Sequence, residues 1–182
     1  MSLAALPKVT SYAVTDADAA TIRDIAAQQE AGARFAAFNA DAAWEVGCAI
    51  REAFLARRKG DQGVIIAIEL FTGHRLFAAV VGAPPVVGPD NWAWAAAKTN
   101  VVRRFGVSSL RKGREFAAQG RTPEAKGLHF PEYACHGGGF PIYLANNDSG
   151  PIGAIVVSGL PQLDDHQLIV DALASLPHLL AK

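Results

Sequence analysis

Cysteine, net charge and long apolar runs are all scarce in this 182-residue sequence. Its two cysteines, Cys48 and Cys135, form neither a CxxC pair nor a disulfide framework. Its 17 lysines and arginines balance 17 aspartates and glutamates, which gives no electrostatic case for nucleic acid or an anionic membrane as a partner. Apolar runs fall well short of the roughly 18 residues that a membrane helix needs, and the N-terminus lacks a secretory signal. We therefore expect a cytoplasmic protein.

Several catalytic motifs are also missing. The sequence has no GxGxxG, no GxxxxGK[ST] and no HExxH, so the motifs that usually indicate phosphate-loop and zincin enzymes are missing. The HGGG stretch that starts at His136 resembles the oxyanion-hole loop of some esterases. Those esterases also need a GxSxG elbow, and Ser158 in "VVSGL" has no glycine two residues before it. We reject the esterase interpretation and assign no set of metal ligands.

Hydrophobic residues make up 51% of the chain, enough for one substantial core. We expect an irregular arm over residues 1–14 and a single α+β domain over 15–182. Capping signals and apolar periodicity predict helices over 15–32, 39–60, 90–105, 108–119 and 161–176. Short β-branched runs predict strands over 63–70, 76–82, 139–145 and 152–159, with a further short strand over 33–38. Because tight turns join these strands in pairs, the sheet should be mainly antiparallel with helices covering its faces.

Three consecutive glycines, Gly137, Gly138 and Gly139, stand at the start of a predicted strand, where each would weaken it. One interpretation is functional: glycine backbone can turn successive N–H groups toward an anion. The other is structural, a bend where another element packs closely. We favour the functional interpretation because Ser158 and Gly159 should lie on the neighbouring strand.

The last hairpin predicts where a site would form. If the chain turns near Asn147–Gly150, Phe140 lies opposite Val157, and the HGGG segment lies beside Ser158 and the start of the final helix. The candidate ligand-binding residues are Gly137, Gly138, Gly139, Ser158, Gly159, His136, His166 and Lys98. The candidate catalytic residues are His136, His166 and Asp165, with Asp164 as an alternative to Asp165.

Each of these polar residues also has a structural interpretation. A histidine on an apolar helix stripe, such as His166, is commonly a hydrogen-bonded core residue. Asp164 and Asp165 occupy the first turn of a helix, where carboxylates complement the helix dipole. Both interpretations stay open at this stage.

Three segments carry a family resemblance: "LFAAVVG…PDNWAWAAAKTNVVRRFGVSS", "YACHGGGFPI" and "IGAIVVSGLPQLDDHQLIVDAL". In that order they resemble the haem-degrading superfamily (GlcG/HbpS-like proteins), and in particular a branch of small cytosolic proteins, over about residues 33–176. The resemblance implies a profilin- or PAS-like fold with a five-stranded antiparallel sheet and helices on both faces. It also implies a homo-oligomer. Some members bind or degrade haem, which makes haem a possible cofactor but does not transfer that activity to this chain, and the cofactor stays unknown at this stage. The resemblance carries no haem ligand onto a position of this sequence.

Three functions follow from these observations. The preferred one is an oligomeric binding protein whose glycine-lined pocket takes haem or a small anionic metabolite. The second is an enzyme in which His136 or His166, oriented by Asp164 or Asp165, acts as an acid, base or metal ligand. The third is an oligomeric scaffold without a ligand.

Overall fold

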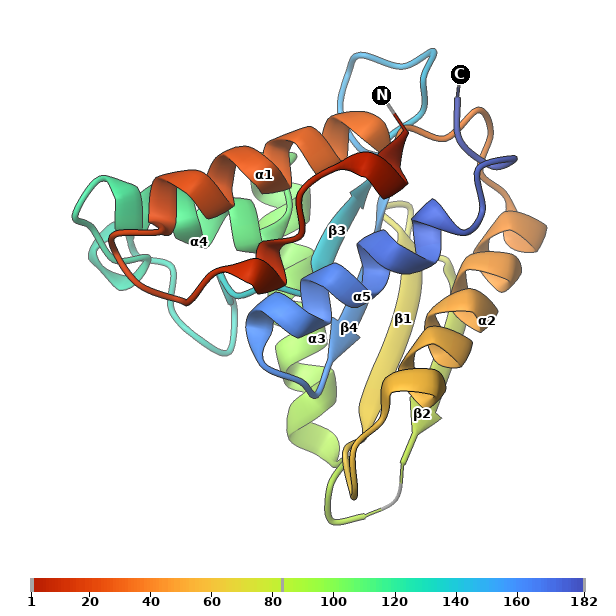
Figure 1. Ribbon diagram of the computed structural model, residues 1–182, viewed down its shortest axis with the longest axis horizontal. Coiled ribbons are helices and arrows are strands. Elements are labelled where there is room, and N and C mark those ends of the chain that lie inside the picture. Colours follow the sequence, from red (N-terminus) through yellow and green to blue (C-terminus); the bar gives the residue numbers. More distant parts are fainter. Residues whose placement is uncertain (1, 83, 182) are drawn as a thin grey trace.

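The computed structural model describes residues 2–82 and 84–181, which form a four-stranded antiparallel sheet in the order β2-β1-β4-β3 (Figure 1). The strands are β1 (Val64–Leu70), β2 (Arg75–Val81), β3 (Gly139–Ile142) and β4 (Gly153–Ser158). The helices are α1 (Ala19–Gly32), α2 (Ala40–Arg57), α3 (Pro89–Phe105), α4 (Ser109–Ala118) and α5 (Gln162–Ala174). The predicted α+β class with an antiparallel sheet is therefore confirmed. Within the described residues, no helix has both the length and the hydropathy to span a bilayer.

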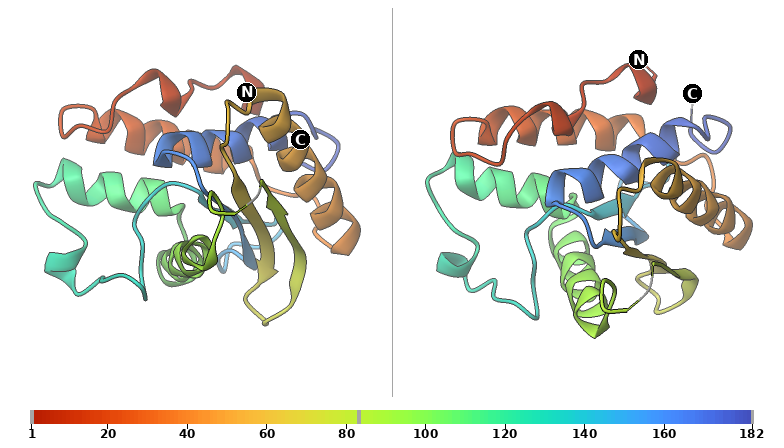
Figure 2. Two further views of the ribbon diagram at one scale, coloured as in Figure 1. Left: turned by 90° about the horizontal axis from the view of Figure 1, so that it is seen from below. Right: turned by 60° about the horizontal axis from the view of Figure 1, so that its bottom comes forward.

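Helices cover both faces of the sheet (Figures 1 and 2). Because successive strand residues point to opposite faces, Ile66 and Ile155 face the core formed with α2 and α5, whereas Ile65 and Val156 face α3. Helix α1 packs on α4 beside the sheet rather than on it. The carboxyl end of β4, the N-terminus of α5 and the middle of α3 consequently meet at one corner.

Local signals placed the helices well. The side chain of Asn39 accepts a hydrogen bond from the N–H of Ala42 at 2.9 Å, and the side chain of Ser108 accepts one from Arg111 at 3.1 Å. Both are N-caps that satisfy amides left free at the first turn. Gly106 ends α3 in the left-handed conformation with φ 69°, as C-terminal glycines commonly do.

The expectation of a fifth strand was wrong. Within residues 33–38, Phe35 forms only isolated bridges, to Leu144 and Leu180. Its N–H donates to the carbonyl of Tyr143, whereas the next amide, that of Ala36, already bonds to Leu179. The segment therefore crosses between two loops before α2 begins, and it anchors the fully buried Phe35 ring without extending the sheet.

The predicted register of the last hairpin was displaced by two residues. Phe140 pairs with Ile155 rather than Val157, and the backbone of Gly138 already joins the sheet, since its carbonyl accepts a hydrogen bond from Val157 at 2.8 Å. The chain reverses one residue earlier than we assumed. The displacement keeps the HGGG segment at the same corner of the sheet.

The N-terminal arm has two 3-10 turns, Leu3–Ala5 and Val9–Ser11, and is otherwise irregular. It is nevertheless part of the packed molecule, because Val9 is fully buried among residues of α1, α4 and α5. Its amide also donates to the side chain of Gln167 at 2.9 Å. The arm thus ties α1 to α5.

Candidate functional site

The three glycines allow an unusually close approach between the loop, β4 and α5. A Cβ at Gly137 would collide with the carbonyl oxygen of Gln162, and one at Gly138 would collide with that of Val157. Gly138 also has φ +109°, which side chains rarely adopt. These contacts support the structural interpretation of the triple glycine.

Two of the three glycine amides have partners within the chain. The Gly139 N–H donates to the hydroxyl of Ser109 at 2.9 Å, and the Gly137 N–H points to the side-chain oxygen of Gln162 at 3.4 Å. The Ser109 hydroxyl in turn donates to the carbonyl of His136. These bonds fix the loop, so the amides of Gly137 and Gly139 are not free to bind an anion.

The close packing places a buried ion pair beneath the loop. Lys98 of α3 and Asp165 of α5 have side chains only 3% and 2% exposed, and their charged atoms lie 2.9 Å apart. The Lys98 ammonium also donates to the carbonyl of Val157 at 2.9 Å, and the other carboxylate oxygen of Asp165 accepts the N–H of Leu160 at 3.0 Å. The pair is thus hydrogen-bonded on both sides, as a buried charge requires.

Burial shifts the acidity of this pair. Removal of water raises the pKa of the Asp165 carboxyl to about 6, and the attraction of Lys98 only partly opposes that rise. The carboxyl therefore gains a proton at mildly acidic pH. A carboxyl that titrates close to neutrality at the edge of a cavity is typical of functional sites.

A cavity of about 300 Å³ opens directly onto the pair. Helix α3 supplies Asn91, Trp94 and Lys98, the end of β4 supplies Ser158, and α5 supplies Asp165. Its complete lining is Asn91, Trp94, Lys98, His136, Ser158, Gly159, Leu160, Gln162 and Asp165. A larger cavity of about 500 Å³ lies between the arm, α2 and α5, but it is rimmed by exposed charges and reaches no buried ion pair. We therefore take the smaller cavity as the candidate site.

His136 is exposed at this cavity, with its ring edge-on to Trp94 at a centroid distance of 5.2 Å. Trp94 in turn packs against Phe130 at 4.7 Å. Neighbouring protein atoms displace part of the water around the accessible His136 ring, and this desolvation, together with the positive charges of Lys98 and Arg114, lowers the pKa of His136. A neutral imidazole at neutral pH can both donate and accept a hydrogen bond here.

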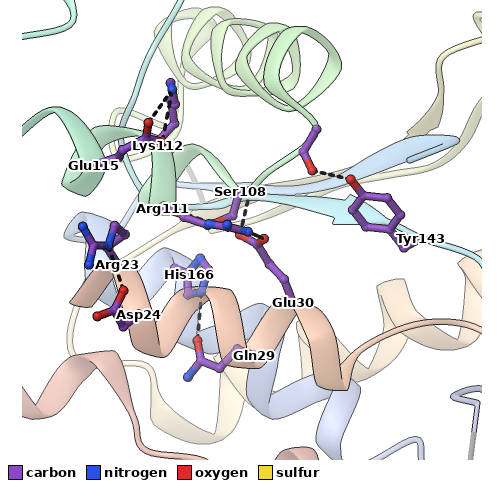
Figure 3. A network of polar contacts seen from close by, with 11 residues as sticks. Arg23, Asp24, Gln29, Glu30, Ser108, Arg111, Lys112, Glu115, Tyr143 and His166 are labelled. Atoms are coloured by element: carbon purple, nitrogen blue, oxygen red, sulfur yellow. Dashed lines mark hydrogen bonds and ion pairs between the residues drawn. The ribbon is translucent and has the colours of Figure 1, made fainter. Parts of the chain in front are cut away.

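His166 is placed differently from our expectation. It is fully buried, does not line the cavity, and lies 3.0 Å from the side-chain oxygen of Gln29 (Figure 3). Because the Gln29 amide nitrogen donates to Pro7 and Gln167, its oxygen must accept, so the His166 Nε2 carries the proton. Burial lowers the pKa of His166 to about 3. These contacts support the interpretation of His166 as a hydrogen-bonded core residue.

The structure therefore gathers part of the set suggested by the sequence. His136, Ser158, Gly159, Asp165 and Lys98 meet at one cavity. The three glycines pack beside it, His166 lies in the core, and Asp164 faces the larger cavity.

Sequence reasoning missed three features of the site. The side chains of Ser109 and Gln162 bond to the glycine loop, and Asn91 lines the cavity. The sequence signal for Ser109 was weak, because it follows the capping serine of α4 and shows no spacing relation to the HGGG segment. Among the described residues, no three His, Cys, Asp or Glu side chains lie close enough together to hold a metal ion.

The fold is that of a small α+β protein with a pocket between an antiparallel sheet and its helices. The family model described as "Haem degrading protein HbpS-like" matches residues 38–174. The chain belongs to this HbpS-like haem-degrading family.

Comparisons of whole chains agree. A UPF0303 protein of Rhizobium etli is 42% identical over 148 residues, covering 81% of this chain and 85% of the relative. A UPF0303 protein of Edwardsiella ictaluri is 41% identical over 150 residues, covering 81% and 89%. The crystal structure of Ybr137w protein superposes with a TM-score of 0.77 at 30% identity, covering 93% of this chain and 91% of that one.

A more distant structure shows the fold alone. A double mutant of Streptomyces reticuli HbpS has a TM-score of 0.55 at 21% identity, covering 76% of this chain and 86% of that one. At this identity the shared fold does not carry ligand-binding residues from one protein to the other.

Proposed function

We propose that this chain is a binding protein for a small carboxylate metabolite, held in the cavity above Lys98 and Asp165. The observation that carries the proposal is the buried ion pair at a solvent-accessible cavity. A buried pair contributes little net stability by itself, so its position at an open pocket favours a role in binding. The ligand carboxylate would accept from Lys98, with the Ser158 hydroxyl and the Asn91 and Gln162 amides as further donors.

The pair also supplies a mechanism for discriminating charge. When Asp165 is ionised, it compensates the positive charge of Lys98, and a bound anion therefore gains little electrostatic free energy. When Asp165 takes up a proton, Lys98 is left uncompensated, and an incoming carboxylate restores the balance. Binding of an anion should therefore be coupled to proton uptake by Asp165.

The family name suggests haem, but the side chains of this cavity favour a smaller acidic ligand. Six of the nine lining residues carry polar side chains, which supply hydrogen-bonding groups suited to a small acidic ligand. His136 is the single imidazole at the cavity, and His166 is enclosed in the core with its Nε2 engaged by Gln29. We therefore assign the cavity to a smaller acidic ligand.

Titration with pentanoate, followed by calorimetry, tests the proposal. We expect Ser158→Ala to weaken pentanoate binding severalfold, because it removes a neutral hydrogen-bond donor. Ser149→Ala, at an exposed turn, serves as the matched control and should bind like the wild type. Equal affinities in the two variants would contradict the assignment of this cavity. A haemin titration provides the second arm, in which a Soret shift abolished by His136→Gln would favour haem instead.

Acid–base catalysis is a second candidate, favoured by the position of the Asp165 carboxyl at the edge of the cavity, where burial raises its pKa to about 6. A carboxyl of that acidity can exchange protons efficiently near neutral pH. The test is deuterium incorporation from D2O into the methyl group of pyruvate, observed by NMR. Exchange that Asp165→Asn abolishes would support catalysis, and exchange no faster than in buffer would count against it.

A further inference from the structure

A second cavity, of about 410 Å³, shares His136 with the first. It lies against α4 and the loop that follows it, and its lining includes Arg114, Arg121, Thr122 and Cys135. Gly113 explains why these parts meet, since any Cβ there would collide with the carbonyl of Cys135. Close packing at Gly113 brings the neighbouring Arg114 beside His136.

Arg114 is the distinctive residue of this second cavity. It is partly buried, and it forms no ion pair within residues 2–82 and 84–181. Every other lysine or arginine without an ion pair in that part of the chain is exposed. Its Nε is buried and has no hydrogen-bond partner there. A partly desolvated guanidinium without a hydrogen-bond partner is unfavourable unless an anion accepts its hydrogen bond and pairs with its charge.

The surroundings of Arg114 select the kind of anion. Asp16 and Glu124 also line the second cavity as exposed carboxylates; neither forms an ion pair with Arg114, although the charge of Asp16 attracts it. Their negative charge disfavours a doubly charged phosphate. A carboxylate carries a single charge and matches the two parallel N–H groups of one guanidinium.

We propose that the ligand is a dicarboxylate that spans both cavities, with one carboxylate at Lys98 and the other at Arg114. His136, which lines both cavities, lies between the two ends and hydrogen-bonds to the ligand. This inference rests on the proposed function, because it assumes that the first cavity binds a carboxylate. It adds a second anchor to Lys98: Asp165 forms an ion pair with Lys98, whereas Arg114 has no ion pair in the described chain and is attracted only by the exposed Asp16.

Calorimetric titration of the full chain with glutarate and with pentanoate tests this inference, because the two probes have equal chain length and differ in one carboxylate. We expect glutarate to bind wild-type protein at least about tenfold more tightly. Arg114→Gln should remove that advantage, so that the variant binds glutarate and pentanoate about equally, since it removes the second charge-assisted contact. Arg103→Gln, an exposed residue that lines neither cavity, is the matched control and should keep the full advantage.

The outcomes separate the two proposals. Equal affinity of the wild type for glutarate and pentanoate would overturn the dicarboxylate and leave the first cavity intact. A glutarate advantage that survives Arg114→Gln would overturn Arg114 as the second anchor. A glutarate advantage lost in Arg121→Gln but kept in Arg114→Gln would overturn the choice of arginine. Failure of both probes to bind would overturn the proposed function itself.

Discussion

Lys98 and Asp165 are two charged residues placed where most proteins carry apolar side chains. Their ammonium and carboxylate lie 2.9 Å apart with almost no exposure, so each charge depends on the other. Desolvation of both groups offsets much of their attraction. Their position beside a cavity is therefore better explained by binding than by stability.

At this residue scale we expect Lys98→Met to lower the free energy of unfolding by about 3–5 kcal/mol, because it leaves Asp165 buried without a counter-charge. The double variant Lys98→Met/Asp165→Leu should recover most of that loss. Urea denaturation of the wild type, Lys98→Met, Asp165→Leu and the double variant measures both effects. A double variant as unstable as the sum of its parts would contradict the strong coupling that we infer.

At the scale of elements, the glycine loop holds β4, α3 and α5 together. Gly138 has a positive φ and no room for a side chain, because a Cβ would collide with Val157 and lie 2.8 Å from the Lys98 ammonium. Gly150 also has a positive φ, +134°, but a Cβ there would meet nothing within 4 Å. Both positions have a positive φ but only Gly138 is closely packed, so a comparison of the two separates the effect of backbone strain from that of close packing.

We expect Gly138→Ala to lower the free energy of unfolding by about 1–3 kcal/mol more than Gly150→Ala, since only the first overpacks an interior. Thermal or urea denaturation of the two variants measures the difference. Equal losses would mean that the loop has room to adapt, and the packing explanation of the triple glycine would fail.

The sequence predicted elements whose signals are local and missed those that depend on partners. Caps at Asn39 and Ser108 and the β-branched runs of β1 and β4 placed their elements correctly, because these signals act within a few residues. The segment around Phe35 looked equally strand-like, yet its backbone finds partners on two different loops. Pairing of that kind is decided by the tertiary fold.

The same distinction applies to the candidate site. The turn predicted for the last hairpin correctly placed His136 near Ser158, although the predicted register was wrong by two residues. Sequence reasoning identified Lys98 and Asp165 separately but could not pair them, because 67 positions separate them along the chain. His166 shares its helix with Asp165, and only the packing of α1 shows that it faces Gln29 instead of the cavity.

At the scale of the whole molecule, a buried polar chain joins the N-terminal arm to the core. His166 contacts Gln29, and Gln29 bonds to Pro7 and Gln167, which also receives the amide of Val9 (Figure 3 shows the His166–Gln29 contact). His166 must stay neutral to remain buried, and burial lowers its pKa from 6.5 to about 3. Protonation of the unfolded chain therefore competes with folding in acid.

We expect stability to fall as the pH drops below about 6.5, by up to roughly 1.4 kcal/mol per pH unit from this one histidine. The raised pKa of Asp165 acts in the opposite direction, since the folded carboxyl holds its proton between pH 3.8 and about 6 when the unfolded one does not. His166→Gln, which keeps a donor for Gln29, should flatten or reverse the loss between pH 7 and 5. Urea midpoints at the two pH values measure it, with exposed His74→Gln as the control. A slope unchanged by His166→Gln would contradict the structural role of His166.

The surface of the single chain is consistent with self-association, which the family resemblance also led us to expect. Trp44, Val80 and Phe130 are 64%, 52% and 47% exposed, and the chain has no net charge to oppose contact. We propose a homo-oligomer, and expect light scattering after size exclusion to give a mass above the single chain of 19.2 kDa. A monomer at micromolar concentration would count against this expectation.

The central claim is that the Lys98–Asp165 pair binds a carboxylate and that Asp165 takes up a proton as it does so. The most direct measurement is the dissociation constant of pentanoate at pH 5.5 and pH 8, for the wild type and for Asp165→Asn. Because the pKa of Asp165 is about 6, we expect wild-type protein to bind at least about tenfold more tightly at pH 5.5. Asp165→Asn, in which Lys98 is always uncompensated, should bind tightly at both pH values. Wild-type affinity that does not change with pH, or an Asp165→Asn variant that keeps the wild-type pH dependence, would contradict the claim.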